Sequence, residues 1–149
     1  MNAKKILLAE DDPHDLELAL AGMQDYNLAN EVIVARDGAE ALDYLYVRGK
    51  FADRSKGNPL LILLDLKMPR VDGLEVLRQV KSDPNLKTIP VVVLTSSKEE
   101  RDIVESYNLG VNAYVVKPVI FEKFIDAAKQ LSMFWLLLNE APPGTVGKV

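Results

Sequence analysis

Short apolar runs alternate with amphipathic segments along the chain. Five of these runs predict β-strands, at Lys5–Ala9, Glu31–Ala35, Leu60–Leu64, Pro90–Leu94 and Ala113–Val116. Three of them are continuously apolar, a pattern typical of strands that are buried on both faces of a parallel sheet. The regular alternation with helical segments predicts an α/β sandwich with right-handed crossovers.

Five helices are predicted between and after the strands from residues that favour helix starts and ends. Their N-cap or first residues are Asp12, Asp37, Asp72, Ser97 and Ile120. The third helix must end near Ser82, because Pro84 follows it. The fifth is expected to run to Leu138. Residues 48–58 form a polar segment that is long for a helix-to-strand connection, so we expect a loop there.

The composition of the chain excludes several classes of protein. The 149 residues fit one domain, with 48% hydrophobic and 27% charged residues and a net charge of −4. This charge gives no reason to expect a nucleic acid partner. Because the chain has no cysteine, disulfides and thiolate chemistry are excluded. No segment has the length of a membrane span or of a signal sequence, so we expect a cytoplasmic protein without a membrane contact.

Acidic residues follow two of the predicted strands. Glu10, Asp11 and Asp12 come after the first strand, and Asp65 comes directly after the third. Ligands bind at the carboxyl edge of parallel sheets, so we expect these side chains to lie close together. Carboxylates at such distances need a cation between them, and oxygen ligands favour Mg²⁺. Asp12 is interpreted as a helix cap, which leaves Glu10, Asp11 and Asp65 as candidate ligands.

A hydroxyl and an amine stand at the ends of two further strands. Thr95 ends the fourth strand and Lys117 follows the fifth. Either residue alone is ordinary, because such a hydroxyl usually caps a helix and such a lysine is usually solvated. Together, strand ends that carry acid, acid, hydroxyl and amine favour in-line phosphoryl transfer to a carboxylate, with Asp65 as the nucleophile.

The chain resembles the receiver domain of two-component response regulators over about residues 4–138. The segments that carry the resemblance are Ile6–Asp12, Leu64–Pro69, Asp72–Gly73, Val93–Ser96 and Tyr114–Pro118. The spacings of 30 residues from Asp65 to Thr95 and 22 from Thr95 to Lys117 are also similar to those of the family. The resemblance implies a three-layer (βα)5 doubly wound fold, with a five-stranded parallel sheet in the flavodoxin-like order 2-1-3-4-5.

The resemblance also implies a role for each site residue. Asp65 would be the phosphoacceptor, with Thr95 and Lys117 contacting the phosphoryl group. Mg²⁺ would be held by Asp11, Asp65 and the backbone carbonyl of Lys67, with Glu10 acting through water. Thr95 and Tyr114 would form the switch that changes the surface of the protein after phosphorylation. Ordinary strand packing is the alternative explanation for Tyr114.

Partners and domain organisation follow from the same resemblance. The phosphoryl donor would be a histidine kinase or a phosphotransfer protein, and the chain would have no enzymatic activity beyond self-phosphorylation and self-dephosphorylation. Residues 1–140 are expected to form the receiver domain, and residues 141–149 a disordered tail. Because no effector domain follows, we expect a stand-alone regulator. The 48–58 loop and residues 133–135 are similar to the single-domain partners of bacterial phytochrome histidine kinases.

Other functions remain possible from the residues alone. A haloacid-dehalogenase-like phosphatase also uses a strand-end aspartate, but it needs a second aspartate at the position that Lys67 occupies here. A dinucleotide-binding domain is disfavoured, because no glycine-rich turn follows the first strand. A receiver-like scaffold that does not accept phosphate is the third alternative, and the complete set of acids, hydroxyl and lysine argues against it.

The last predicted helix carries apolar residues on all of its sides near its end. Residues 133–138 are Met-Phe-Trp-Leu-Leu-Leu. One face of a sheet cannot bury a helix all round, and an exposed apolar patch often marks a binding surface. We therefore expect a homodimer or kinase contact that includes Phe134 and Leu137, and the alternative is a C-terminal turn that folds back over them.

Overall fold

The computed structural model describes residues 5–25, 31–96 and 100–117. Three predicted features lie outside the described residues: the Ser97 cap, the helix at 120–138 with its dimer contact, and the tail at 141–149. None of the helices in the described ranges is long and apolar enough to cross a membrane.

In the part of the chain that the structure describes, five parallel strands form one sheet in the order β2-β1-β3-β4-β5, which confirms the predicted topology. The strands are β1 (Lys5–Ala9), β2 (Glu31–Ala35), β3 (Leu61–Leu64), β4 (Val91–Thr95) and β5 (Ala113–Val116). In the register of the sheet, Ala9 of β1 lies between Ala35 of β2 and Leu64 of β3. These three strands therefore end side by side, and the residue after each strand reaches the same edge.

Two strands differ by one residue from their predicted limits. β3 begins at Leu61 instead of Leu60, although the Leu60 N–H still donates to the Lys5 carbonyl at 2.7 Å. β4 runs from Val91 to Thr95, whereas the sequence predicted Pro90 to Leu94. Pro90 has no N–H to donate, and it joins the sheet only through its carbonyl, which accepts from Ile62 at 3.0 Å.

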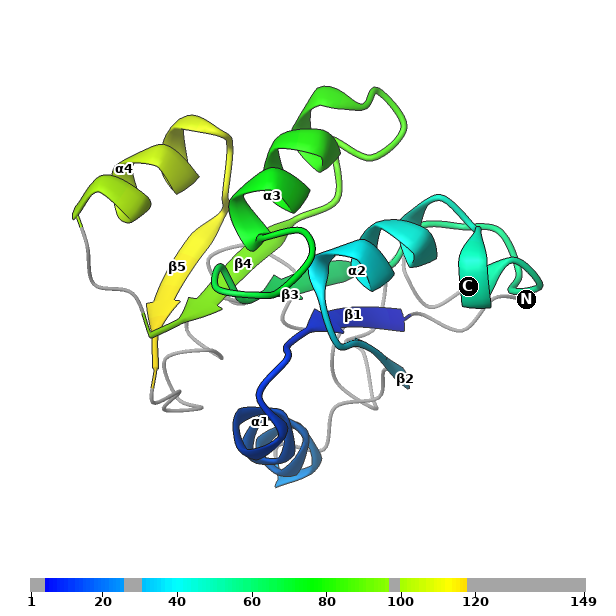
Figure 1. Cartoon of the computed structure of the whole chain (residues 1–149), viewed down its shortest axis with the longest axis horizontal. Helices are drawn as coiled ribbons and strands as arrows, with labels where there is room; N and C mark the ends of the chain where they lie inside the picture. The colour runs from blue at the N-terminus through cyan, green and yellow to red at the C-terminus, as the bar shows by residue number, and fades with distance from the viewer. Residues whose placement is uncertain (1–4, 26–30, 97–99, 118–149) are drawn as a thin grey trace, which may run out of the picture.

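Helices cover both faces of the sheet, as Figure 1 shows. They are α1 (Pro13–Asp25), α2 (Gly38–Leu45), α3 (Gly73–Ser82) and α4 (Glu100–Asn108), with a short 3-10 turn η1 (Gly49–Phe51). In the described part of the chain α1 lies on one face, and α2, α3 and α4 lie on the other. This arrangement is the predicted α/β sandwich.

Aspartates cap three of the helices as the sequence predicted. The Asp12, Asp37 and Asp72 carboxylates each accept a hydrogen bond from the N–H three residues later, at 3.0, 2.8 and 2.9 Å. Such bonds satisfy amide groups that have no partner inside the helix. Each cap therefore fixes where a helix begins at the carboxyl edge of the sheet.

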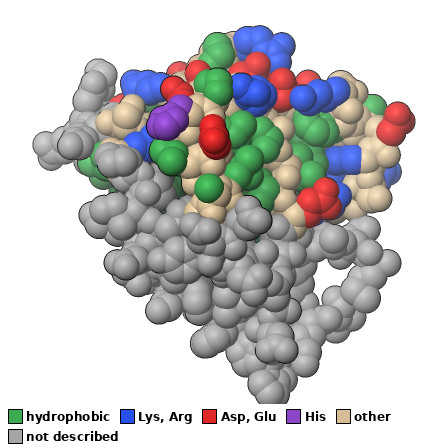
Figure 2. All heavy atoms as spheres, turned by 90° about the horizontal axis from the view of Figure 1, so that it is seen from below, with side chains coloured by type: hydrophobic (Ala, Val, Ile, Leu, Met, Phe, Trp, Pro, Cys, Tyr) green, Lys and Arg blue, Asp and Glu red, His purple; other side chains and the backbone are tan. Residues whose placement is uncertain are grey.

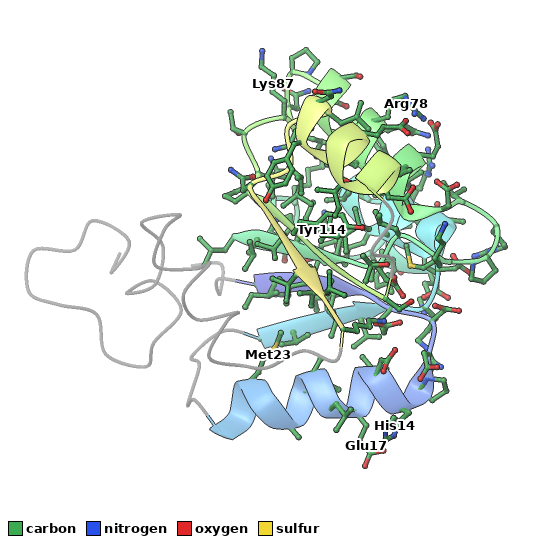
Figure 3. The ribbon with its side chains drawn as sticks, turned by 90° about the vertical axis from the view of Figure 1, so that its left-hand side faces the viewer. His14, Glu17, Met23, Arg78, Lys87 and Tyr114 are labelled. Atoms are coloured by element: carbon green, nitrogen blue, oxygen red, sulfur yellow. The ribbon has the colours of Figure 1, made fainter. Side chains whose placement is uncertain are left out.

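Alternate residues of the central strands supply two separate cores, because successive side chains of a strand point to opposite faces. Leu7, Ile62 and Leu64 belong to the core under α2 and α3. Ile6, Leu8, Leu61 and Leu63 belong to the core under α1, with Ala19 and Met23 of that helix. Figure 3 shows Met23 directed toward the sheet, while His14 and Glu17 point away from it.

The outer side of α1 is not wholly polar. Leu18 is 54% exposed and Leu20 is 37% exposed. Figure 2 views the molecule from below Figure 1 and shows apolar side chains among charged ones on this face. His14, the single histidine of the chain, lies on the same surface.

The predicted loop at 48–58 is organised around Arg54. Its Nε donates to the Tyr44 carbonyl at 2.8 Å, and its guanidinium lies 3.9 Å from the centre of the Tyr44 ring. Its Nη1 donates to the carbonyls of Ser55 and Gly57. One side chain therefore satisfies three backbone acceptors, which holds a long connection in a defined path.

Candidate phosphoacceptor site

Asp65 lies at the end of β3 with its backbone fixed by the neighbouring strand. Its N–H donates to the Ala9 carbonyl at 3.0 Å, which extends the β1–β3 pairing by one residue. The residue is only 5% exposed. An apolar strand has thus placed a carboxylate at the carboxyl edge of the sheet, the position where parallel α/β folds bind ligands.

Two acids from the end of β1 lie beside this carboxylate. The Glu10 N–H donates to the Ala35 carbonyl at 2.9 Å, and Glu10 is 3% exposed. Carboxylate oxygens of Glu10, Asp11 and Asp65 lie within 4.8 Å of one another. The structure brings together the three predicted side-chain ligands. Oxygen donors at this spacing fit a hard divalent cation.

Lys117 supplies the positive charge of the site. Its Nζ lies 2.6 Å from Glu10 Oε1, 2.8 Å from Asp15 Oδ2 and 3.1 Å from Asp65 Oδ2. The Lys117 N–H donates to the Thr95 carbonyl at 2.7 Å, so the backbone of β4 sets the position of the lysine. The side chain is 11% exposed, which leaves the ammonium poorly screened by water.

The charges at this edge shift one another's proton affinities. Burial raises the pKa of the Glu10 carboxyl to about 7; Lys117 opposes this shift, and Asp65 adds to it. Burial alone would lower the pKa of Lys117, but hydrogen bonds to Asp15 and Glu10 outweigh burial and raise it. The lysine is therefore a permanent cation at physiological pH. A second cation near Glu10 would favour its ionised form.

The structure also locates the other predicted site residues. Thr95 is completely buried at the end of β4, where it pairs with Val116 and its carbonyl accepts from the Lys117 N–H. Tyr114 is partly buried and packs against the core under α2 and α3. The Lys67 N–H donates to Asp65 Oδ1 at 3.3 Å, so the backbone of Lys67 lies against the Asp65 carboxylate. The metal-binding role of the Lys67 carbonyl and the switch roles of Thr95 and Tyr114 stay predictions.

Two positions at this edge make contacts that the sequence did not predict. Asp15 contacts Lys117, but its place in the first turn of α1 is explained equally well by the helix dipole. Gly73 opens α3, and a Cβ built on it would lie 2.1 Å from the Asp65 carbonyl oxygen. A glycine after a helix cap is common, so only the three-dimensional contact shows that a larger side chain would meet the backbone of Asp65 and Leu66 here.

The loop after Asp65 is held by an ion pair with the second helix. Arg70 Nε and Nη2 donate to Asp37 Oδ2 and Oδ1 at 2.8 and 3.0 Å. Arg70 has φ 65°, a left-handed conformation that costs energy for a residue with a side chain. Arg70 lowers the pKa of Asp37, and the capped N–H of Glu40 shifts it in the same direction. Asp37 therefore joins the cap of α2 to the loop that follows Asp65, which we call the acceptor loop because Asp65 is the predicted phosphoacceptor.

Replacement of Asp37 by alanine is expected to lower the free energy of unfolding by about 1–2 kcal/mol near neutral pH, because it removes a helix cap and an ion pair. Asp37→Asn keeps a capping oxygen and should lose less than about 1 kcal/mol. Because the pKa of Asp37 is lowered in the folded protein, its carboxylate stabilises the fold at pH values above its unfolded pKa of 3.8. This contribution is lost as the pH falls through the lowered pKa of the folded state. Urea unfolding measured from pH 7 downward should show that the free energies of unfolding of Asp37→Ala and wild type become more similar in acid. A difference that does not change with pH would contradict a stabilising role of the Asp37 charge.

A family model matches most of the chain. The model of the response regulator receiver domain matches residues 6–129. The chain is 40% identical to the response regulator Rcp1 of Synechocystis sp. over 133 residues, which cover 89% of each protein. A solved structure of Rcp1 with bound Mn²⁺ has a TM-score of 0.75 to this chain, with 39% identity, and the match covers 93% of this chain and 99% of that one.

Two further solved structures are similar. The bacteriophytochrome response regulator RtBRR shares 61% identity with a TM-score of 0.85, and the match covers 96% of this chain and 86% of that one. The phosphorylated cyanobacterial phytochrome response regulator RcpA shares 44% identity with a TM-score of 0.75, and the match covers 91% of this chain and 95% of that one. The predicted family resemblance, including its narrower relation to phytochrome regulators, is confirmed.

Proposed function

The chain belongs to the response regulator receiver domain family, and we propose that it accepts a phosphoryl group on Asp65 in a Mg²⁺-dependent reaction. Phosphorelay signal transduction is the function of this family. The observation that best supports Asp65 as the acceptor is its contact with Lys117, 3.1 Å away, in an edge that also holds Glu10 and Asp11. The phosphatase alternative is set aside, because the family and the lysine at position 67 both disagree with it.

The reaction can be written from the residues at the edge. An oxygen of the Asp65 carboxylate attacks phosphorus of a phosphohistidine, an O–P bond forms, and the P–N bond breaks with its electron pair on the departing imidazole. The Lys117 ammonium neutralises charge on the phosphoryl oxygens, and the Thr95 hydroxyl donates to one of them. The buried apolar strands beneath Asp65 limit the access of water.

Glu10, Asp11, Asp65 and the Lys67 carbonyl would hold the cation. Their all-oxygen donor set fits Mg²⁺, and the Mn²⁺-bound structure of Rcp1 supports a divalent metal in a relative. When bound, Mg²⁺ would neutralise negative charge at the transferring phosphoryl group. Glu10 would act through water, a role that leaves its 2.6 Å ion pair with Lys117 in place.

The relatives' names support a partner class. Similarity to bacteriophytochrome response regulators favours a phytochrome-type histidine kinase, or a phosphotransfer protein, as the phosphoryl donor. We propose a cytoplasmic signalling protein whose own chemistry is limited to self-phosphorylation and self-dephosphorylation. A homodimer through residues 120–138 remains a proposal, which sedimentation of the full chain and of Phe134→Asp would test.

Acetyl phosphate provides the direct test of the acceptor. Incubation with acetyl phosphate and Mg²⁺ is expected to add the mass of one phosphoryl group to the intact protein. Asp65→Asn should show no adduct, and chelation of the metal should suppress the adduct in the wild type. A wild-type protein that stays unmodified, or an adduct that persists in Asp65→Asn, would contradict the proposal.

A further inference from the structure

The carboxylate of Asp15 reaches the acceptor edge from helix α1. Its Oδ2 lies 2.8 Å from Lys117 Nζ, although the two residues are 102 positions apart in the sequence. Within the described residues two other carboxylates contact this ammonium, those of Glu10 and Asp65, which directly follow β1 and β3. An acid in the first turn is favourable in any helix, but that effect does not require contact with a lysine. The contact therefore links α1 to the reactive edge.

The Lys117 ammonium has one N–H for each of these carboxylates. A lysine ammonium carries three donors and no acceptor. Its nitrogen lies 2.6 Å from Glu10 Oε1, 2.8 Å from Asp15 Oδ2 and 3.1 Å from Asp65 Oδ2. Because the three N–H bonds keep fixed directions relative to one another, the two shorter contacts determine where the third N–H points. It points to the predicted phosphoacceptor.

Asp15 is the partner of the lysine that a bound metal would affect least. Glu10 and Asp65 belong to the carboxylate cluster that would hold Mg²⁺, so the cation would offset part of their negative charge. Their attraction for the ammonium would then weaken. Asp15 reaches the ammonium from α1 and is not a member of that cluster. With the metal in place, Asp15 is therefore the main anchor of the ammonium beside the acceptor.

A small cavity gives the lysine an alternative position. Its volume is about 30 Å³, which is room for about one water molecule. The cavity is bordered by α1 and the ends of β1 and β4, and its lining includes Leu8, Glu10, Asp15, Ala19, Leu94 and Lys117. A lysine has a flexible stem and a strongly hydrated ammonium. Without the Asp15 carboxylate, the ammonium can turn toward water in this space and away from Asp65.

We propose that Asp15 is a positioning residue that directs the Lys117 ammonium toward Asp65 during phosphoryl transfer. The proposal rests on Asp65 being the acceptor. With acetyl phosphate as the donor, an Asp65 oxygen forms a bond to phosphorus, and the bond from phosphorus to the acetyl oxygen breaks with its electron pair on the departing acetate. The third N–H of Lys117 passes from Asp65 Oδ2 to an oxygen of the transferred group. Asp15 itself touches neither the donor nor the phosphoryl group.

Helix α1 offers a matched pair of substitutions. Asp15→Ala removes the carboxylate that contacts Lys117. Glu17→Ala removes a carboxylate from the same helix, but the Glu17 side chain is exposed and points away from the sheet in Figure 3. The two variants share the same change in net charge. A difference between them therefore reports the contact with Lys117.

The first measurement is the rate of modification by acetyl phosphate, followed by intact mass at saturating Mg²⁺. Saturation removes any effect of the substitutions on metal affinity. Asp15→Ala is expected to react about tenfold more slowly than wild type, because a misdirected group beside the reacting atoms costs a factor of this order. Glu17→Ala should react at the wild-type rate. Asp15→Asn keeps a neutral and weaker acceptor for the lysine, so its rate should lie between those of wild type and Asp15→Ala.

The second measurement is the exchange of the Lys117 ammonium protons with water, which a loss of helix stability alone does not change. In protein with isotope-labelled lysine, nuclear magnetic resonance identifies this ammonium as the signal that is absent from Lys117→Arg. Hydrogen bonds to the carboxylates protect its protons. With Mg²⁺ present, exchange should be about fivefold faster in Asp15→Ala, the size expected for one lost hydrogen bond. Glu17→Ala should match the wild type.

Each outcome decides the proposal. If Asp15→Ala reacts as fast as wild type, or if its Lys117 protons exchange no faster, Asp15 does not position the ammonium, while the acceptor function stands. An equal loss of rate in Glu17→Ala would assign the effect to the charge of α1 and contradict the proposal. If the wild type is not modified, the acceptor function itself fails. Should Asp15→Ala not fold, Asp15→Asn replaces it, and a wild-type rate or wild-type proton exchange in this variant would overturn the proposal.

Discussion

Replacement of Lys117 by methionine is expected to lower the free energy of unfolding by about 3–5 kcal/mol in the absence of divalent metal, because it removes the cation from a buried cluster of acids. The lysine nitrogen contacts Glu10, Asp15 and Asp65 within 3.1 Å, and two of these residues are almost completely buried. Asp15 is more exposed and should contribute less. Acetyl phosphate should no longer modify the variant at a measurable rate.

Two conditions should partly restore the stability of this variant. Mg²⁺ would place a cation among Glu10, Asp11 and Asp65, and so replace part of the lost charge. Lower pH should also help, because the pKa of Glu10 is already raised to about 7 with the lysine present. A carboxyl with a raised folded pKa destabilises the fold as pH rises from its unfolded value of 4.5 through 7, and this cost is absent below that range.

Lys81→Met is the matched control for the loss of a partly buried lysine. Lys81 donates to the carbonyls of Lys87 and Ile89 at 3.1 and 2.8 Å and lies away from the acid cluster. Its loss should cost about 1–2 kcal/mol. Urea unfolding with and without Mg²⁺ should show a metal-dependent recovery in Lys117→Met alone. Equal metal dependence in the two variants, or a Lys117→Met protein as stable as wild type, would refute the charge argument.

The acceptor edge could be predicted from the sequence because its residues follow strands. Asp65 and Lys117 each come directly after an apolar run, and parallel strands deliver such residues to one edge. Continuous apolar runs also predict that both faces of the sheet are covered, because successive side chains of a strand point to opposite faces. Helix starts at Asp12, Asp37 and Asp72 follow from local hydrogen bonding between a side chain and the nearby backbone, so they too are visible in the sequence.

The connections between this edge and the rest of the molecule could not be predicted in this way. Asp15 and Lys117 are 102 residues apart, and Arg70 and Asp37 are 33 apart. Such pairs depend on how loops pack in three dimensions, and the spacing of nearby residues in the sequence does not indicate them. The same holds for the ion pair of Lys67 and Asp102, since a lysine beside the acceptor and an acid on a helix each have an ordinary explanation alone. Sequence patterns thus locate the reactive groups, while tertiary packing decides what those groups are linked to.

Gly73→Ala is expected to destabilise the protein by more than about 3 kcal/mol and to reduce phosphoryl acceptance. A Cβ at this position would lie 2.1 Å from the Asp65 carbonyl oxygen and 2.7 Å from the Leu66 Cα. Both are backbone atoms next to the acceptor, so no side chain can rotate to relieve the contact. The Gly73 N–H also donates to the Leu66 carbonyl at 2.9 Å, which ties the start of α3 to the same segment. In Gly73→Ala, either Asp65 or the start of α3 must therefore move.

Gly38→Ala distinguishes a general loss of stability from a displacement of Asp65. Gly38 also opens a helix, and a Cβ there would lie 1.8 Å from the Val71 carbonyl oxygen, at the far end of the acceptor loop. Both substitutions should lower the thermal midpoint, but only Gly73→Ala displaces the residue that carries the nucleophile. The rates should be compared at a temperature where circular dichroism shows that both variants are folded. Acetyl phosphate should then modify Gly73→Ala at least about tenfold more slowly than Gly38→Ala, because a small displacement of a reacting group has an effect of this size. Equal rates in the two variants would mean that Gly73 serves the packing of α3 and has no part in positioning Asp65.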